Sequence, residues 1–145
     1  MLIIPIILVA TAAFATAVFA HSGVKNPAVK ARMDLMGEIK EATGVLGNMA
    51  KGTLGFDAAQ AAAAQAALLD AAERIDAAFE APESDPKSEA LPVIWTDWAG
   101  FQAETAGMIR AVAALDPGSL TGVRAGIGPI GQSCGRCHEG YRIKK

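Results

Sequence analysis

Residues 119–142 read SLTGVRAGIGPIGQSCGRCHEGYR, and this stretch decides how the chain folds. Its larger side chains recur at alternating spacings of four and three residues, which places them on one face of a helix. Pro129 lies inside the pattern and removes a backbone donor, so we expect either a kink or a helix that begins near Gly128. The positions on the shared face are Val123, Ile127, Ile130, Cys134, Cys137 and Tyr141.

Three further helices are predicted upstream, over residues 26–50, 57–79 and 95–115. The first repeats the three–four spacing, and the second begins at Asp57, a residue type that caps helix N-termini. Residues 80–92 contain three prolines and form a loop. Short links on either side of one longer loop predict an all-α fold, an antiparallel four-helix bundle. The shared face of the first helix consists of Val29, Arg32, Met36, Ile39, Thr43, Leu46 and Ala50.

Composition and charge exclude some classes of partner. Hydrophobic residues make up 52% of the chain and aromatic residues 6%, and the formal net charge is −2. No cluster of Lys and Arg appears before the last few residues, so we expect no nucleic-acid partner.

Residues 2–20 carry no charge and end in Val18-Phe19-Ala20, a small-residue cleavage pattern. We interpret residues 1–20 as a signal peptide that is removed after Ala20, which leaves one domain at residues 21–145. No Lys or Arg precedes the apolar run, so an uncleaved membrane anchor is the alternative. Cleavage predicts export to the periplasm without stable membrane insertion.

The segment Cys134-Gly135-Arg136-Cys137-His138 is C-x-x-C-H, the attachment pattern of a c-type haem. Two thiols one helical turn apart can each form a thioether with a vinyl group of the porphyrin, and the adjacent imidazole can bind the iron. The motif predicts one covalent haem c held by Cys134 and Cys137, with His138 as the proximal ligand.

Other uses of two cysteines fit this chain less well. A redox-active C-x-x-C is typical of a βαβ setting, whereas this one lies near the end of an all-helical chain. Structural zinc needs four ligands, and only His21 could be added to the three in the motif. A disulfide between residues three apart in a helix would be strained and would constrain almost nothing.

The arrangement resembles the class II cytochromes c, the cytochrome c′ family, in which the motif lies near the C-terminus of a four-helix chain. The stretches that carry the resemblance are Lys51-Gly52, Phe56 to Gln60, Ile94 to Asp97, Phe101, Cys134 to His138, and Gly140 to Arg142. The resemblance implies a haem within the bundle and the first helix over its distal face.

Alignment on this family places Met36 at the distal position, one turn after Arg32. A methionine there implies the low-spin branch, in which its thioether binds the iron, and Met33 and Met49 are the substitutes if the register differs. An inward methionine can also be ordinary core packing. Arg32 is a candidate partner of a haem propionate, with a surface charge as the alternative.

The sequence therefore predicts an electron-transfer cytochrome with a six-coordinate haem, which exchanges electrons with redox protein partners. The alternative is a five-coordinate haem protein that binds nitric oxide or carbon monoxide, and a third possibility is a haem-free helical adaptor. No catalytic constellation stands out, so we expect no enzyme activity. The resemblance also raises the prospect of a homodimer through the first two helices.

Covalent attachment predicts that the haem survives denaturation. After expression with haem-attachment machinery, the protein should stain for haem on a denaturing gel, because thioether bonds persist when the fold is lost. A chain that folds but does not stain would support the haem-free adaptor instead.

Overall fold

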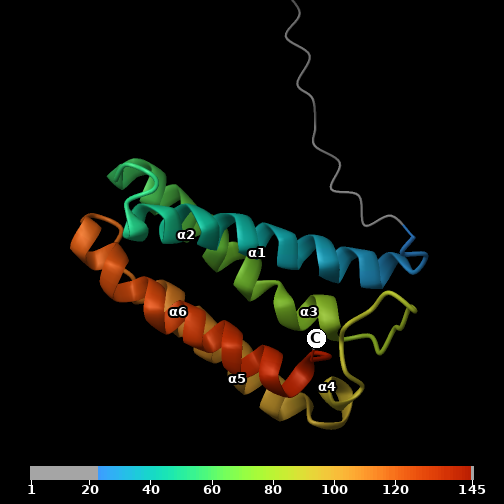
Figure 1. The fold of residues 1–145 in the computed structure, drawn as a ribbon. Helices are drawn as coiled ribbons and strands as arrows, with labels where there is room; N and C mark the ends of the chain where they lie inside the picture. Colours follow the sequence, from blue (N-terminus) through green and yellow to red (C-terminus); the bar gives the residue numbers. More distant parts are fainter. Residues whose placement is uncertain (1–22, 145) are drawn as a thin grey trace, which may run out of the picture.

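The computed structural model describes residues 23–144, in which the chain forms an antiparallel bundle built from six helices (Figure 1). The predicted signal peptide and its cleavage point lie outside these residues. No helix of the described part is long and apolar enough to cross a membrane. The helices are α1 (Pro27–Lys51), α2 (Ala58–Glu73), α3 (Ile75–Phe79), α4 (Val93–Thr96), α5 (Trp98–Ala113) and α6 (Leu120–Tyr141).

Local sequence signals fix the ends of the long helices. The Asn26 side chain accepts hydrogen bonds from two backbone N–H groups of the first turn of α1, and Pro27 follows in the first helical position. α1 ends at Gly52, whose φ of 79° is the left-handed conformation that glycine adopts without strain. Asp57 and Ser119 cap α2 and α6 through their side-chain oxygens. These caps explain why the helix starts lie close to their predicted positions.

The helices bury one continuous apolar core. α1 packs against α2 and α6, and α5 packs against the same two helices, so the four long segments form a closed bundle (Figure 1). Leu46, Leu68, Val112 and Ile130 contribute one fully buried side chain from each of these helices. The all-α four-helix bundle predicted from the spacing of apolar residues is therefore confirmed.

The second and third predicted helices are each interrupted, and the fourth begins earlier than the start near Gly128 that Pro129 suggested. The second breaks at Arg74, whose N–H bonds to Ala71, three residues back instead of four. The third breaks at Asp97, where a non-helical backbone lets the carboxylate cap α5 at the N–H of Gly100. α6 continues through Pro129 from Leu120, so a start near Gly128 is wrong.

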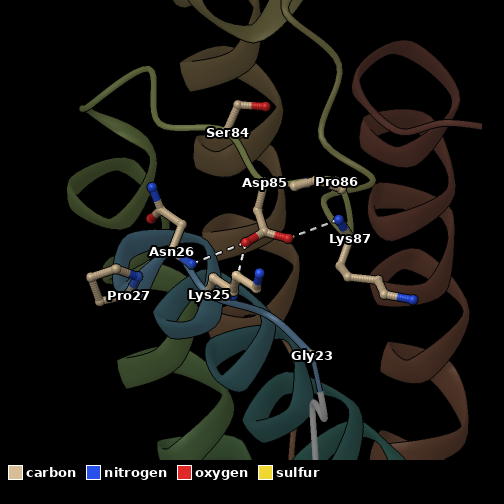
Figure 2. Close-up of a pocket in the computed structure, with 8 residues that line it drawn as sticks. All are labelled: Gly23, Lys25, Asn26, Pro27, Ser84, Asp85, Pro86 and Lys87. Carbon is tan, nitrogen blue, oxygen red and sulfur yellow. Dashed lines mark hydrogen bonds between the residues drawn. The ribbon is translucent and has the colours of Figure 1, made fainter.

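The loop between α3 and α4 is tied to the start of α1 by one carboxylate. Asp85 is 8% exposed, and its oxygens accept hydrogen bonds from the backbone N–H groups of Lys25, Asn26 and Lys87 at 2.9, 3.0 and 2.8 Å (Figure 2). These hydrogen bonds favour the charged form and lower the pKa of Asp85. The ionised carboxylate therefore holds the loop against α1.

We predict that this carboxylate makes the fold sensitive to acid. Because the pKa of Asp85 is lower in the folded than in the unfolded chain, its stabilisation is present above the ordinary Asp value of 3.8 and is lost as the pH falls through the lower folded pKa. Asp85→Asn should therefore destabilise the holoprotein at neutral pH and flatten the loss of unfolding free energy below about pH 4. Denaturant unfolding, followed by helical circular dichroism between acid and neutral pH, measures both effects.

Glu41→Gln, which removes an exposed carboxylate of α1, is the control and should leave the pH profile almost unchanged. Equal profiles for Asp85→Asn and the unmodified protein would contradict the assignment.

Candidate functional site

The C-x-x-C-H motif occupies the last two turns of α6, with its two cysteines on the side that faces the bundle. Cys134 and Cys137 are free cysteines, each half-buried and packed against the core cluster. They are three residues apart in a continuous helix, which places both sulfur atoms on the same face. The structure therefore brings the two predicted attachment thiols together, as the sequence indicated.

The environment of these thiols fits an uncharged thioether. Burial raises the pKa of both, that of Cys137 to about 11, so neither forms a reactive thiolate at neutral pH. Within residues 23–144, no group of three or more His, Cys, Asp and Glu side chains is placed to hold a metal ion. The raised pKa of both thiols is therefore compatible with a covalent thioether and unfavourable to a reactive dithiol centre.

His138 directly follows Cys137, and its side chain reaches the surface of α6. Desolvation by the surrounding protein lowers its pKa, and the positive charge of Arg142 adds to this effect. The imidazole is therefore neutral at pH 7, which is the form that binds iron.

A row of aromatic rings joins the first half of α1 to the last turn of α6. The Arg32 guanidinium lies over the ring of Phe79, 5.0 Å from its centroid. Phe79 packs on Phe101 at 5.2 Å between centroids, and Phe101 meets the edge of Tyr141 at 5.4 Å. We call Phe79, Phe101 and Tyr141 the aromatic row; it places Arg32 and the C-x-x-C-H motif at the same end of the bundle.

Tyr141 is anchored at its hydroxyl as well as at its ring. The hydroxyl donates a hydrogen bond to Asp97 at 2.7 Å, which raises the pKa of Tyr141 to about 12. Its backbone carbonyl accepts the N–H of Leu91 at 3.0 Å. The turn that follows His138 is thus fixed to the start of α5 and to the loop before α4.

Arg32 is only 3% exposed, so the predicted alternative of a surface charge is wrong. Its guanidinium donates hydrogen bonds to the backbone carbonyls of Ala78, at 2.9 Å, and Glu83, at 2.8 Å, and also to that of Ala81. The guanidinium carbon of Arg32 also lies 5.2 Å from the centroid of the Trp95 ring. Burial lowers the pKa of the guanidinium, and the charge of Glu83 opposes this shift.

These contacts give Arg32 a structural role that the sequence did not reveal, because its partners are backbone carbonyls at the end of α3 and in the following loop. Three of its five N–H groups are occupied, so a propionate could be met only by the remaining two. The propionate contact stays a prediction.

Met36 lies one turn beyond Arg32 on α1, half-buried and packed against the core cluster. Met33 is also half-buried, whereas Met49 is fully buried thirteen residues further along the helix. Because each residue of a helix advances about 1.5 Å, Met49 lies about 20 Å from Met36, towards the other end of the bundle. Among the three methionines of α1, Met36 and Met33 are therefore the two at the end that carries the motif.

The fold and these residues define a class of protein: a four-helix bundle with a c-type haem attached near its C-terminus. The family model of cytochrome c′ matches residues 27–142. The chain belongs to the cytochrome c′ family, whose cofactor is one covalently attached haem c.

Individual relatives agree with this assignment. Cytochrome c-556 of Agrobacterium tumefaciens (strain apple 185) is 35% identical over 119 residues, which cover 79% of this chain and 94% of that protein. Cytochrome c′ of Cereibacter sphaeroides is 32% identical over 146 residues, covering 96% and 98% of the two chains.

Among solved structures, a nitric oxide complex of a cytochrome c prime variant from Alcaligenes xylosoxidans has a TM-score of 0.73 and 32% identity, and covers 81% of this chain and 94% of its own. A carbon monoxide complex of another variant of that protein has a TM-score of 0.72 at the same identity and coverage. These comparisons show the family, and they do not support the methionine-ligated branch within it.

The buried guanidinium predicts a large loss of stability for Arg32→Met. The substitution leaves three carbonyls without their donor and removes the cation from two aromatic rings, so we expect the unfolding free energy of the holoprotein to fall by about 2–4 kcal/mol. Denaturant unfolding followed by circular dichroism measures this change.

Arg74→Met is the matched control, since Arg74 forms ion pairs with Glu38 and Asp70 at the surface. Exposed ion pairs contribute little, so this variant should lose much less stability. A similar loss of unfolding free energy in the two variants would show that the buried contacts of Arg32 do not stabilise the fold more than a surface ion pair does.

Proposed function

We propose that this protein is a monohaem cytochrome that binds nitric oxide or carbon monoxide on the side of the haem covered by α1. Cys134 and Cys137 would hold the haem, and His138 would bind its iron. When bound, the haem supplies an iron that can take up a diatomic gas or a single electron. The gas complexes of the Alcaligenes xylosoxidans relative carry this proposal.

The residues around the motif suit a rigid site with an apolar distal face. The aromatic row and the Tyr141–Asp97 hydrogen bond fix the turn that carries His138. On α1, Leu35 is 3% exposed and belongs to the core cluster, and Met36 packs against this cluster, so the helix presents apolar side chains there. Such a surface excludes water while it admits a small uncharged ligand.

A six-coordinate electron carrier is the second candidate, and one observation favours it. Met36 lies at the same end of the bundle as His138, on the helix that the family resemblance places over the distal face. A thioether that binds the iron would occupy the position a gas needs. It would also keep the iron's ligands the same in both oxidation states, which suits electron transfer.

For either candidate, we propose export to the periplasm and no catalytic chemistry. The signal-peptide pattern at residues 1–20 supports export.

Substitution of the sulfur alone separates the two candidates. Met36→Leu removes the thioether and keeps a side chain of similar volume, so packing changes little. If Met36 only packs, the unmodified protein should show a high-spin visible spectrum and bind carbon monoxide readily, and Met36→Leu should leave both nearly unchanged. Visible and near-infrared spectra of the ferric and ferrous holoproteins, with and without carbon monoxide, measure this.

The opposite outcome would establish the electron carrier: a low-spin spectrum with the weak thioether-to-ferric-iron band, which Met36→Leu abolishes as it opens the iron to carbon monoxide. Met33→Leu is the control for the register and should change neither spectrum. Loss of the band in Met33→Leu alone would move the ligand to Met33.

A further inference from the structure

Positive charge is concentrated in the last part of an acidic chain. Residues 119–145 contain five Lys or Arg and one Glu, whereas the rest contains eight Lys or Arg and 14 Asp or Glu. The segment with the haem-attachment motif therefore carries a net charge of +4, while the whole chain carries −2. An asymmetry of this kind creates a local field opposite in sign to the net charge.

Two arginines meet on the outer side of the α5–α6 pair. The side chains of Arg110 on α5 and Arg136 on α6 both reach Gly107: their Nη2 atoms lie 3.8 and 3.9 Å from the point where a Cβ of Gly107 would stand. Both residues are exposed, and α5 and α6 run side by side (Figure 1). Two like charges are thus held close together at the surface, an arrangement that a bound anionic group would stabilise.

One carboxylate connects this pair of arginines to the haem-attachment site. Glu104 lies one turn before Gly107 on α5, and its Oε2 atom is 3.4 Å from Nε of Arg136. Arg136, the partner of Glu104, directly precedes Cys137 in the chain, so this ion pair lies beside the attachment motif. The surface formed by Glu104, Gly107, Arg110 and Arg136, here called the arginine surface, therefore borders the haem site.

We propose that the arginine surface is a docking site for an acidic face of an electron-transfer protein. Guanidinium groups bind carboxylates through two parallel hydrogen bonds, and two of them side by side can engage a cluster of Asp and Glu. Arg136 stands between Cys134 and Cys137 in the sequence, so a partner docked there lies next to the attached haem. The proposal adds a redox partner to the proposed haem protein, and it holds whether the iron is five-coordinate or six-coordinate.

Direct binding to an acidic polymer tests the surface. The haem-loaded protein should bind poly-L-glutamate at low ionic strength, and binding should weaken as salt screens the charges. Arg110→Gln/Arg136→Gln should weaken binding by about fivefold to tenfold, as expected for two exposed ion pairs. Isothermal titration calorimetry measures the affinity independently of any reaction at the iron.

The control is Lys40→Gln/Lys51→Gln, which removes the same amount of charge from exposed positions of α1. It should change the affinity less than twofold. Glu104→Gln should strengthen binding, because it releases Arg136 from its ion pair. Equal losses in the two double variants would show that net charge, and not this surface, is responsible, and would overturn the proposal.

A small anionic oxidant provides a second measurement. Ferricyanide takes one electron from the ferrous protein, which becomes ferric while ferricyanide becomes ferrocyanide. A local positive field should make the rate constant fall as ionic strength rises, although the chain as a whole is negative. Arg110→Gln/Arg136→Gln should remove or reverse this dependence, and the α1 control should retain it.

Two further outcomes would reject the docking proposal. A ferricyanide rate that rises with salt in the unmodified protein would mean that no positive field exists at the haem. Binding to phosphatidylglycerol vesicles but not to poly-L-glutamate would assign the surface to a membrane. Neither result bears on the gas and ligation spectra, so failure of this proposal can be told from failure of the proposed function.

Discussion

The buried cation of Arg32 and the aromatic row beneath it are the interaction on which the functional end of the bundle depends. One guanidinium joins α1 to the end of α3 and to the loop that follows, through three backbone carbonyls and two rings. The row then continues through α5 to the last turn of α6. A charge this deeply buried is tolerated only when its donors are paired, so the cation and its cage of carbonyls stabilise each other.

This connection also sets the relative positions of the two helices that would face the iron. Arg32 and Tyr141 are the first and last residues of this series of contacts. Met36 lies one turn after Arg32 on α1, and His138 lies one turn before Tyr141 on α6. Because α1 and α6 run antiparallel, moving inward from both ends brings these residues towards the same level of the bundle. The scaffold therefore places Met36 and His138, the distal and proximal candidates, at a similar level along the bundle.

The sequence was sufficient for features that depend on local order. The three–four spacing predicted the helices, and Asp57 predicted the start of α2. The C-x-x-C-H pattern predicted two thiols on one face of a helix, where the structure has them. It was insufficient for Arg32 and Asp85, whose partners are backbone groups about 50 to 60 residues away. Every residue has a backbone C=O, and every residue except proline has a backbone N–H. The identity of the residues therefore gives no signal for such contacts.

The two faces of α6 follow from the same helical period. Positions 134 and 137 fall on the inward face and bring the thiols to the core, while position 136 turns Arg136 outward towards Gly107 and Arg110. A helix that carries the two cysteines of the motif on its inner face thereby presents charge on its outer face, within one turn of them. Both guanidinium groups come within van der Waals distance of the Cβ position of Gly107, beside α5. In the proposed docking, the attachment motif sets where a partner would come closest to the haem, and the arginine surface sets the charge that this partner would carry.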